Sequence, residues 1–370
     1  MRIAIFSENL LMNSGGAEVY ALKLAEVLSK KHNIEVFTVS QKNVDVNDVY
    51  KKYNVPHFIT KQIKRTFSTS KIKELFYRII FWFKLKKQVN GKYDYYINTS
   101  CNRMLGFTKT KSIHLVHFPV QPYSKIFKGR LGVFLDKTYR KSYYQFWSNS
   151  EFTKGYLNKY WAVESIVVNP PIDMKTITED EILKKENIII VVGRLVPDKK
   201  IKELIESFLN IHNYINNYKL VVIGNKDINF ANYYEQLCSY TKDNDFIKIL
   251  SDISYNMLVD NYKKAKIFWH AKGVGVDENN PLLMEHFGMT TVEAMANGCI
   301  PIVINKAGQK EIVEQNVSGF LWDTFEQLQQ STINLINNNC LMNQLYKKVI
   351  ERSQLYLMPS FTEKVNNLII

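Results

Sequence analysis

The feature that most constrains the fold is a regular alternation of short apolar runs with helix-like stretches. The clearest run is residues 188–192, five β-branched residues in succession, and a helical pattern follows at residues 201–211. Uninterrupted apolar runs are typical of strands buried on both faces, so the alternation predicts parallel sheets covered by helices. The other strand candidates are residues 2–6, 34–39, 112–120, 144–148, 220–223, 247–250, 267–270 and 300–304, and the other helical stretches include 17–28 and 290–297. We expect an α/β fold built from Rossmann-like domains.

The length and one proline pair predict two domains. A chain of 370 residues is long enough for about two domains, each with a core of its own. Pro170 and Pro171 break both helix and sheet between two series of alternating elements. We therefore place a hinge there, with a first domain at residues 1–170 and a second domain that starts at residue 171. Two such domains in tandem would place the ligand-binding ends of both sheets across a common cleft.

The charge is divided unevenly between the two domains. The chain has 49 Lys and Arg residues against 35 Asp and Glu residues, which gives a net charge of +14. Residues 1–170 carry +17 and the remaining residues carry −3, so the two halves face different partners. Within the first half, residues 61–87 carry +8 and residues 125–141 carry +5. Nucleic acid is a minor option as the partner, because the chain has neither zinc-finger spacing nor an RNA-recognition signature.

Cysteine spacing and hydropathy indicate the compartment. The four cysteines are too scattered for a disulfide scaffold or a CxxC pair, which favours a reducing compartment. The amino terminus turns polar at Ser7, too early for a signal peptide, and no stretch reaches the roughly 18 apolar residues of a spanning helix. We expect a soluble or peripheral protein in the cytoplasm.

The first basic cluster has the pattern of an amphipathic helix. Apolar residues recur there at helical spacing, and charged residues fall on the other side. The apolar residues are Ile72, Phe76, Ile79 and Phe83, and the charged ones are Lys73, Glu74, Arg78 and Lys84. Such a helix can lie on an anionic bilayer, with aromatic rings in the interface and lysines at the headgroups. An ordinary core-facing helix with a solvated basic rim fits the pattern equally well.

A basic loop follows the strand at residues 188–192. Its sequence is Gly-Arg-Leu-Val-Pro-Asp-Lys-Lys, residues 193–200. Arg194 offers a planar fork and Lys199 or Lys200 a point charge, a pairing suited to a diphosphate. Taken alone, this loop has the composition of an ordinary solvated loop.

A second motif spans residues 285–298. A polar, glycine-bearing turn leads from Glu285 into a short helix that contains Glu293, and Gly298 closes that helix. The start of a helix offers unpaired N–H groups and the positive end of the helix dipole, which together bind phosphate. The two glutamates could accept hydrogen bonds from the hydroxyl groups of a sugar and a ribose. The plainer alternative makes Glu285 a loop carboxylate and Glu293 a surface residue.

Together these residues carry a resemblance to a known family. The chain resembles the family 4 retaining glycosyltransferases, two-domain enzymes of the GT-B fold, over nearly its whole length. The matching segments are Ser14–Glu18, Gly193–Lys199, Glu285–Met295, Ser148–Phe152, Asn169–Asp173 and Ser360–Lys364. The resemblance implies two Rossmann-like domains that face each other across a cleft. Residues 1–170 would bind the acceptor, residues 171–352 the nucleotide sugar, and residues 353–370 would form a helix that crosses back to the first domain.

The resemblance also implies roles for residues of the second domain. Glu285 would hold hydroxyls of the donor sugar, and the backbone of Phe287 and Gly288 would lie beside the sugar and the diphosphate. Glu293 would bind the ribose. Arg194 and Lys199 would offset the charge on the leaving nucleoside diphosphate. Lys200 stands where the family often has glycine, so either lysine could reach the phosphate.

Two residues of the first domain match the family as well. Gly16 would let the first loop approach the diphosphate, where a side chain would obstruct it. His117 matches the active-site histidine at a strand end, although a lone histidine is more often structural.

The implied reaction transfers a hexose from a UDP- or GDP-sugar to a hydroxyl of a glycan or lipid-linked acceptor, with retention at the anomeric carbon. The resemblance implies no metal ion and no cofactor other than this donor, and we predict that Asp243–Asp245 forms a turn. His286 replaces a common glycine, and residues 273–284 lengthen the loop before Glu285. The Phe-Gly pair after His286 is similar to the subgroup with the cytosolic mannosyltransferase of dolichol-linked glycan assembly, but it does not determine the sugar.

Three alternatives compete with this interpretation. A nicotinamide-dependent dehydrogenase is disfavoured because the first loop has Gly15 and Gly16 but lacks the third glycine of G-x-G-x-x-G. A nucleotide-sugar epimerase shares the fold and would turn over the donor without an acceptor. A non-catalytic membrane-binding module would explain the basic half but not the two-glutamate motif. We expect a role in cell-envelope polysaccharide assembly, with the basic domain on the inner face of an anionic membrane.

Overall fold

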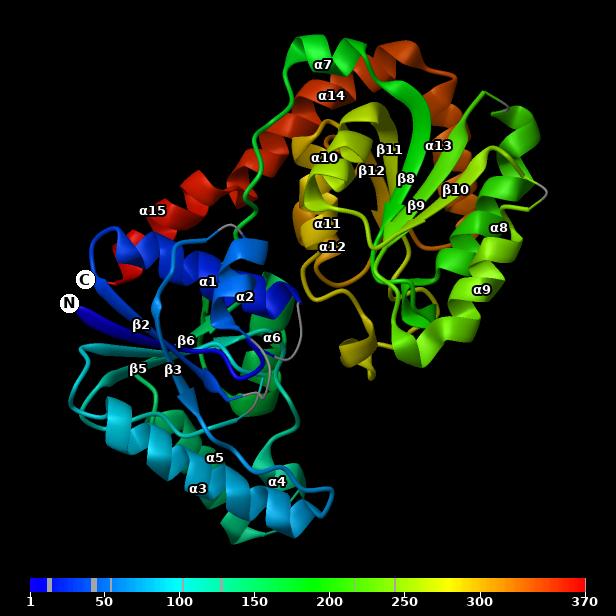
Figure 1. Cartoon of the computed structure of the whole chain (residues 1–370). Coiled ribbons are helices and arrows are strands. Elements are labelled where there is room, and N and C mark those ends of the chain that lie inside the picture. Colours follow the sequence, from blue (N-terminus) through cyan, green and yellow to red (C-terminus); the bar gives the residue numbers. More distant parts are fainter. Residues whose placement is uncertain are drawn as a thin grey trace. The chain divides into compact units, whose positions relative to one another are not determined.

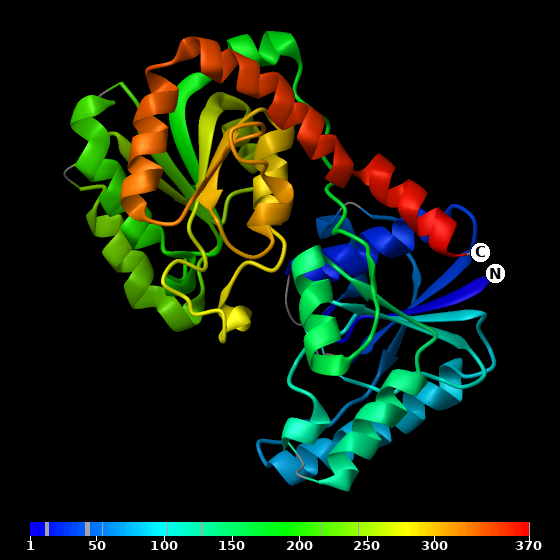
Figure 2. The ribbon, with the colours of Figure 1, turned by 180° about the vertical axis from the view of Figure 1, so that it is seen from behind.

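The computed structural model of the protein describes residues 1–11, 15–40, 45–53, 55–101, 103–126, 129–215, 217–242 and 244–369. The chain forms two compact units, Met1–Pro171 together with Phe361–Ile370, and Ile172–Ser360. Each unit is a parallel β-sheet covered by helices on both faces (Figures 1 and 2).

The first unit has a sheet of seven strands among its described residues, in the order β3-β2-β1-β4-β5-β6-β7. Its first six strands follow the Rossmann order, which places a topological switch between β1 and β4. The strands are β1 (Arg2–Phe6), β2 (Asn33–Val39), β3 (Ile59–Ile63), β4 (Tyr95–Asn98), β5 (Lys111–Val116), β6 (Gln145–Ser148) and β7 (Ile166–Val167). The helices are α1 (Gly16–Ser29), α2 (Val46–Lys52), α3 (Lys71–Val89), α4 (Tyr123–Ile126), α5 (Arg130–Lys141), α6 (Glu151–Trp161) and most of α15 (Met358–Leu368).

The last helix, α15, packs on the first helix of the first unit. Phe361 and Val365 of α15 are buried, and the Phe361 ring centroid lies 5.6 Å from that of Tyr20 on α1. The Tyr20 hydroxyl donates a 2.5 Å hydrogen bond to the Val168 carbonyl oxygen. The carboxyl-terminal residues therefore belong to the core of the first unit.

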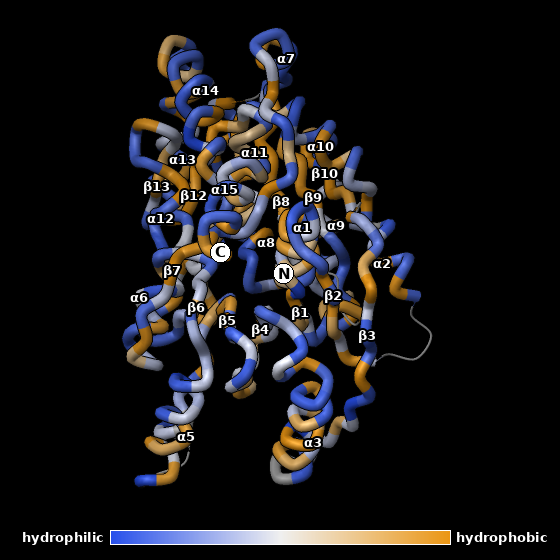
Figure 3. The backbone as a smooth tube through the Cα atoms, turned by 90° about the vertical axis from the view of Figure 1, so that its left-hand side faces the viewer, coloured by the Kyte–Doolittle hydropathy of each residue, from blue (hydrophilic) through white to orange (hydrophobic). Residues whose placement is uncertain are grey.

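The second unit repeats the Rossmann order, β10-β9-β8-β11-β12-β13, over its described residues. Figure 3 shows its central strands as hydrophobic segments, as expected for strands buried on both faces. The strands are β8 (Glu186–Val192), β9 (Lys219–Gly224), β10 (Ile247–Ser251), β11 (Ala265–His270), β12 (Ile300–Ile304) and β13 (Phe320–Trp322). The helices are α7 (Glu179–Leu183), α8 (Ile201–Ile211), α9 (Ala231–Ser239), α10 (Tyr255–Lys264), α11 (Met289–Ala296), α12 (Gln309–Ile312), α13 (Phe325–Ile336) and α14 (Asn339–Ser353). Short 3₁₀ turns are η1 (Pro197–Lys199), η2 (His212–Tyr214), η3 (Ile228–Phe230), η4 (Pro281–Leu283) and η5 (Gln354–Tyr356).

Helix α8 shows why these sequences fold in this way. Its apolar residues recur every three or four positions and are buried, while the residues between them are polar. The buried apolar residues are Ile201, Leu204, Ile205, Phe208 and Ile211. The helix therefore packs its apolar face against the core of the second unit, which includes β9, and exposes the other face to water.

The predicted strands are confirmed, with one shortened, and the sequence analysis missed four others. The strand predicted at residues 112–120 ends at Val116, so His117 lies just beyond it. The missed strands are β3, β4, β7 and β13; β7 has two residues, β13 has three, and β3 is an edge strand with Lys61 and Gln62 in its middle. Edge strands and very short strands lack the continuous apolar run on which the prediction relied. No helix among the described residues is both long and apolar enough to cross a bilayer.

Candidate functional site

The candidate site lies at the carboxyl edge of the second sheet. Strands β8 and β11 are adjacent there, at the point where the strand order reverses. Ligands of open α/β sheets bind at such a switch point, outside the carboxyl ends of the strands. Gly193 and Arg194 follow β8, and His270 ends β11.

Lys199 and Glu285 meet at this edge. Lys199 Nζ lies 2.6 Å from Glu285 Oε2, and His270 Nε2 lies 3.4 Å from the same oxygen. The side chains of Lys199 and Glu285 are about one-fifth exposed, and that of His270 is buried. The structure thus brings together two residues that are 86 positions apart in the sequence.

Two further charged residues lie beside this pair. Lys272 Nζ is 3.6 Å from Asp198 Oδ2, and Asp198 immediately precedes Lys199 in η1. The other carboxylate oxygen of Asp198 is buried and has no hydrogen-bond partner among the described residues. Neither Lys272 nor Asp198 was predicted as a site residue.

Glu285 is held in its ionised form. Burial alone would raise its pKa, but the charge of Lys199, the nearby His270 ring and the charge of Lys272 outweigh burial, so the pKa lies well below 4.5. Burial lowers the pKa of His270 from 6.5, against the opposing effect of Glu285, so the imidazole is neutral at pH 7. The edge therefore presents a carboxylate, a neutral imidazole and two ammonium groups.

The start of α11 is built by a tight backbone approach. Gly288 precedes the helix with φ of +121°, and a Cβ there would lie 2.6 Å from Gln309 Nε2. A Cβ on Gly308 would overlap the backbone of Phe287, and the Gly308 N–H donates a 3.0 Å hydrogen bond to the Glu285 carbonyl oxygen. Gln309 is fully buried, and its Nε2 has no partner among the described residues, although Oε1 accepts from Thr291. Amide donors are thus concentrated next to Glu285.

Arg194 and Lys200 contact other residues. The Arg194 side chain is 62% exposed, and its Nη1 lies 3.8 Å from Asp227 Oδ2. Lys200 Nζ lies 3.0 Å from Glu203 Oε1. Lys200 has φ of +57°, a left-handed conformation that glycine adopts without strain, which explains why glycine is common there in the resembling family.

Glu293 lies inside α11, on a side that faces α10. The Tyr262 hydroxyl of α10 donates a 3.1 Å hydrogen bond to Glu293 Oε2. Burial raises the pKa of Glu293 from 4.5 to about 7, and this bond offsets burial only in part. The carboxyl group therefore changes its charge within the physiological pH range.

The predicted residues of the first unit lie at the carboxyl edge of its own sheet. Gly16 is the first residue of α1, and Ser14 falls outside the described residues. His117 Nε2 lies 3.1 Å from the Thr99 carbonyl oxygen, and the ring contacts Tyr20 edge-on with centroids 5.8 Å apart. Burial lowers the pKa of His117 from 6.5 to about 4, so the ring is neutral at pH 7.

Sequence reasoning missed His270, Lys272, Asp198, Gln309 and Tyr262. His270 and Lys272 had a usable signal, because polar residues at the end of a central strand reach the ligand-binding edge. Gln309 and Tyr262 had none, since only the fold brings them to α11. Within the described residues, no group of three His, Cys, Asp or Glu side chains could hold a metal ion.

Comparison with known proteins identifies the second unit. The family model of the glycosyl transferases group 1 matches residues 173–356, about half of the chain. Residues 173–356 are a group 1 glycosyltransferase domain. The Lys199, Glu285 and Glu293 positions all belong to this group 1 domain.

The matches to curated proteins cover about half of this chain and less than half of each relative. The chain is 25% identical over 207 residues to the GDP-Man:Man(3)GlcNAc(2)-PP-Dol alpha-1,2-mannosyltransferase of Dictyostelium discoideum, which covers 48% of this chain and 37% of the relative. The protein of the same name in Homo sapiens is 26% identical over 208 residues, 51% of this chain and 40% of the relative. The chain thus spans about two-fifths of the length of these relatives.

Solved structures resemble the group 1 domain together with the rest of the chain. The Anabaena protein Alr3699/HepE, in complex with UDP and glucose, matches with a TM-score of 0.72 and 14% identity, over 100% of this chain and 99% of that one. The sucrose-phosphate synthase of Thermosynechococcus elongatus matches with a TM-score of 0.73 and 17% identity, over 99% and 98% of the two chains. These likenesses establish the fold: two Rossmann-like units of the GT-B architecture.

Proposed function

We propose that this protein is a family 4 retaining glycosyltransferase that moves a hexose from a nucleotide-diphosphate sugar to a hydroxyl of a glycan or lipid-linked acceptor. The observation that carries the proposal is the ionised Glu285 beside Lys199, next to the start of α11, in a group 1 glycosyltransferase domain. A carboxylate paired with an ammonium group suits a ligand that brings both hydroxyl donors and a negative diphosphate.

The donor would occupy the edge of the second unit. Lys199 and Arg194 offset the negative charge that grows on the leaving diphosphate, and the free amides at the start of α11 add to this stabilisation. Glu285 accepts hydrogen bonds from hydroxyls of the transferred sugar, and the backbone of Phe287 and Gly288 lines the sugar and diphosphate. These cationic groups supply the charge that a metal ion would otherwise supply, so the proposed reaction is independent of metal.

Other residues would complete the donor and acceptor sites. Glu293 binds the ribose hydroxyls, and its rise in pKa is reversed when those hydroxyls donate to it. Lys200 is the second candidate for the diphosphate, but its contact with Glu203 favours Lys199. Gly16 serves the diphosphate and His117 the acceptor, as the family resemblance implies. With retention, a donor phosphate oxygen assists deprotonation of the acceptor, and no protein nucleophile is assigned.

The curated relatives suggest which donor to test first. They are named for GDP-mannose and a dolichol-linked acceptor, whereas the solved structure crystallised with UDP shares only the fold. GDP-mannose is therefore the first candidate, followed by UDP-sugars. A lipid-linked acceptor in cell-envelope polysaccharide assembly fits the +17 charge of residues 1–170, which would hold the protein on the inner, anionic face of a membrane.

Two measurements test the proposal. The melting temperature is recorded with GDP, UDP and their sugars, and the true donor raises it most because it binds only the folded state. Release of nucleoside diphosphate is then measured with and without acceptor for the wild type, Glu285→Gln and Glu179→Gln. Glu179 is an exposed glutamate of the second unit, 3.3 Å from Lys347, and serves as the matched control.

The expected loss for Glu285→Gln is about 100-fold or more, the scale seen when one group that stabilises the transition state is removed. Glu179→Gln should keep the wild-type rate. Unchanged turnover in Glu285→Gln would reject the proposed site. Conversion of the donor to another sugar without an acceptor would identify a nucleotide-sugar epimerase instead.

A further inference from the structure

Helix α3 of the first unit has two apolar sides. Phe81, Leu85 and Val89 are buried in the core under the sheet. Of the predicted apolar stripe, however, Phe76 is 59% exposed and Phe83 is 58% exposed, while the side chain of Ile72 lies outside the described part of the chain. Leu75 and Ile79 on the same helix are each 46% exposed. The helix therefore does face the core, but through residues other than the predicted stripe.

Helix α5 repeats this arrangement. Gly132, Asp136 and Tyr139 are its buried residues. Three large apolar side chains of its first turns are exposed: Leu131, Val133 and Phe134, at 59%, 56% and 63%. Two helices that are 41 residues apart in the sequence thus both direct aromatic and aliphatic side chains to solvent.

The two helices lie on the same face of the first sheet (Figures 1 and 3). A segment at residues 104–107 joins them. The Trp82 Nε1–H of α3 donates a 2.8 Å hydrogen bond to the Leu105 carbonyl oxygen, and the Gly106 N–H donates a 2.9 Å bond to Ser142 Oγ after α5. The two exposed apolar sets therefore belong to one layer.

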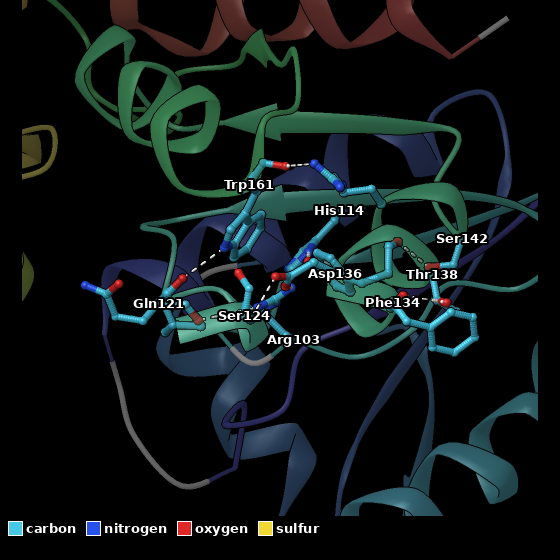
Figure 4. Close-up of polar contacts among 12 residues, drawn as sticks. Arg103, His114, Gln121, Ser124, Phe134, Asp136, Thr138, Ser142 and Trp161 are labelled. Atoms are coloured by element: carbon cyan, nitrogen blue, oxygen red, sulfur yellow. Dashed lines mark hydrogen bonds and ion pairs between the residues drawn. The ribbon is translucent and has the colours of Figure 1, made fainter. Parts of the chain in front are cut away.

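Helix α5 is also fixed to the segments that follow β4 and β5 (Figure 4). Arg103 Nη2 lies 2.6 Å from Asp136 Oδ1, and the Ser124 N–H donates a 2.9 Å hydrogen bond to the other oxygen. The Arg103 guanidinium lies 4.6 Å from the Tyr139 ring centroid and 5.2 Å from that of Trp161. This partly buried network holds α5 in one position, so the exposed apolar side chains of its first turns are held on a fixed backbone.

The exposed apolar residues begin at the end of the unit where His117 lies and extend past the middle of α3 to Phe83. In a parallel sheet each connecting helix begins at the carboxyl edge and returns to the amino edge. Helix α3 follows β3 and α5 follows β5, so both helices start at the carboxyl edge, where His117 follows β5. The apolar residues lie in the first thirteen residues of α3 and the first five of α5.

The charge around these residues identifies the partner. Residues 61–87 carry +8 and residues 125–141 carry +5, and the exposed cations include Lys73, Lys84, Lys87, Arg130 and Lys137. A second copy of the chain docked on this face would bring like charges together. An anionic bilayer accepts both features, since aromatic and aliphatic side chains enter the interface and lysines meet the headgroups.

We propose that the starts of α3 and α5 form one docking surface for an anionic bilayer, and that this surface holds a lipid-linked acceptor at the edge that carries His117. The second half of this inference rests on the proposed function. The first half does not, because vesicle binding requires neither donor nor acceptor.

The test is flotation of the full chain with vesicles of phosphatidylcholine, alone and mixed with phosphatidylglycerol. We expect binding only to the mixed vesicles, and weaker binding as salt is raised. Phe76→Ser with Phe134→Ser should lower the partition coefficient by about tenfold for each ring, from the free energy of burying one phenylalanine. The matched control, Leu183→Ser with Ile228→Ser, removes two residues of the second unit that are 85% and 92% exposed, and it should bind as the wild type does.

Each outcome decides the proposal. Equal binding by the double variant and its control overturns the surface, as does binding to neutral vesicles alone. A change in oligomeric state with the same substitutions assigns the face to a second copy instead. If binding is lost as expected but no sugar is transferred by the wild type, the surface stands and the proposed function fails. If sugar transfer occurs but vesicle binding does not depend on α3 and α5, the proposed function stands and the docking surface fails. Far-ultraviolet circular dichroism checks that each variant is folded.

Discussion

The two sheets share a strand order, yet the residues predicted for the site at their carboxyl edges differ in charge. The edge of the second unit holds Lys199 against Glu285, with Lys272 and Asp198 beside them. At the edge of the first unit, His117 is neutral and bonded to the carbonyl oxygen of Thr99. Both edges thus hold a neutral histidine and an ion pair, Lys199 with Glu285 in the second unit and Arg65 with Glu8 in the first, but the residues predicted for the site are ionised in the second unit and neutral in the first.

The difference fits a division of labour between a charged and an uncharged substrate. A nucleoside diphosphate needs cationic groups, whereas an acceptor hydroxyl needs a neutral hydrogen-bond partner. In the neutral His117 ring, Nε2–H donates to the Thr99 carbonyl, which leaves Nδ1 as an acceptor.

The charge of the second edge is tested at its two adjacent lysines. Lys199→Met removes the ammonium group beside Glu285 and should lower turnover by about 100-fold, because the leaving diphosphate loses its nearest counter-charge. Lys200→Gly should change turnover by less than about threefold. It should also raise stability by roughly 1 kcal/mol, since Lys200 has φ of +57°. Steady-state kinetics measure the turnover of both variants, and thermal unfolding measures their stability. A larger loss of turnover in Lys200→Gly than in Lys199→Met would assign the diphosphate contact to Lys200.

The packing of the two units is compared with two glycine substitutions. Gly308→Ala places a methyl group against the Phe287 backbone, so it should destabilise the protein by about 2 kcal/mol and weaken donor binding. Gly155→Ala in α6 has open space around it and should stabilise the first unit by roughly 0.5 kcal/mol through helix propensity. Urea unfolding measures both. Equal changes in the free energy of unfolding would mean that the loop before α11 shifts to accommodate the added methyl group.

The sequence was sufficient for most of the fold. Continuous β-branched runs such as residues 188–192 occur because both faces of the strand are buried, so the pattern and the burial have one cause. Strand β4, by contrast, is Tyr-Tyr-Ile-Asn, and its two aromatic residues gave no distinct strand signal although all four residues are buried. Its burial comes from β1 and β5 on either side, which local sequence does not encode.

The site was predictable only where a side chain belongs to a motif. Glu285 and Lys199 were named from the sequence, but their 2.6 Å contact depends on two loops 86 residues apart. The stripe at Phe76, Ile79 and Phe83 shows the converse. Its helical period was evident in the sequence. The side of the helix that packs against the sheet, however, is the one that carries Phe81, Leu85 and Val89. A helix with two apolar sides cannot be oriented from its period alone.

Glu293 gives the second edge a pH dependence. Its pKa of about 7 means that the carboxyl group is mostly protonated at pH 6 and ionised at pH 8. The ionised form accepts the ribose hydroxyls in stronger, charge-assisted hydrogen bonds, so affinity for the nucleoside diphosphate should rise by up to about tenfold over this range. In Glu293→Gln that part of the rise should vanish. Isothermal titration calorimetry measures both proteins, and phosphate ionisation cancels because the ligand is the same. Parallel pH profiles would remove Glu293 from the ribose site.

Stability should depend on pH with opposite sign in the two units. The folded-state pKa of Glu293 is raised from 4.5 to about 7, so the folded second unit binds more protons and loses stability as pH rises through that window. The folded-state pKa of His117 is lowered from 6.5 to about 4, so the first unit loses stability as pH falls from 6.5 to 4. His117→Gln should remove about 1 kcal/mol of this loss at pH 5, a modest value because solvent reaches part of the ring. Hydrogen exchange of peptides from β5 and from α11 follows each unit separately. The same slope in both peptides would show that neither edge owes its pH dependence to the group named here.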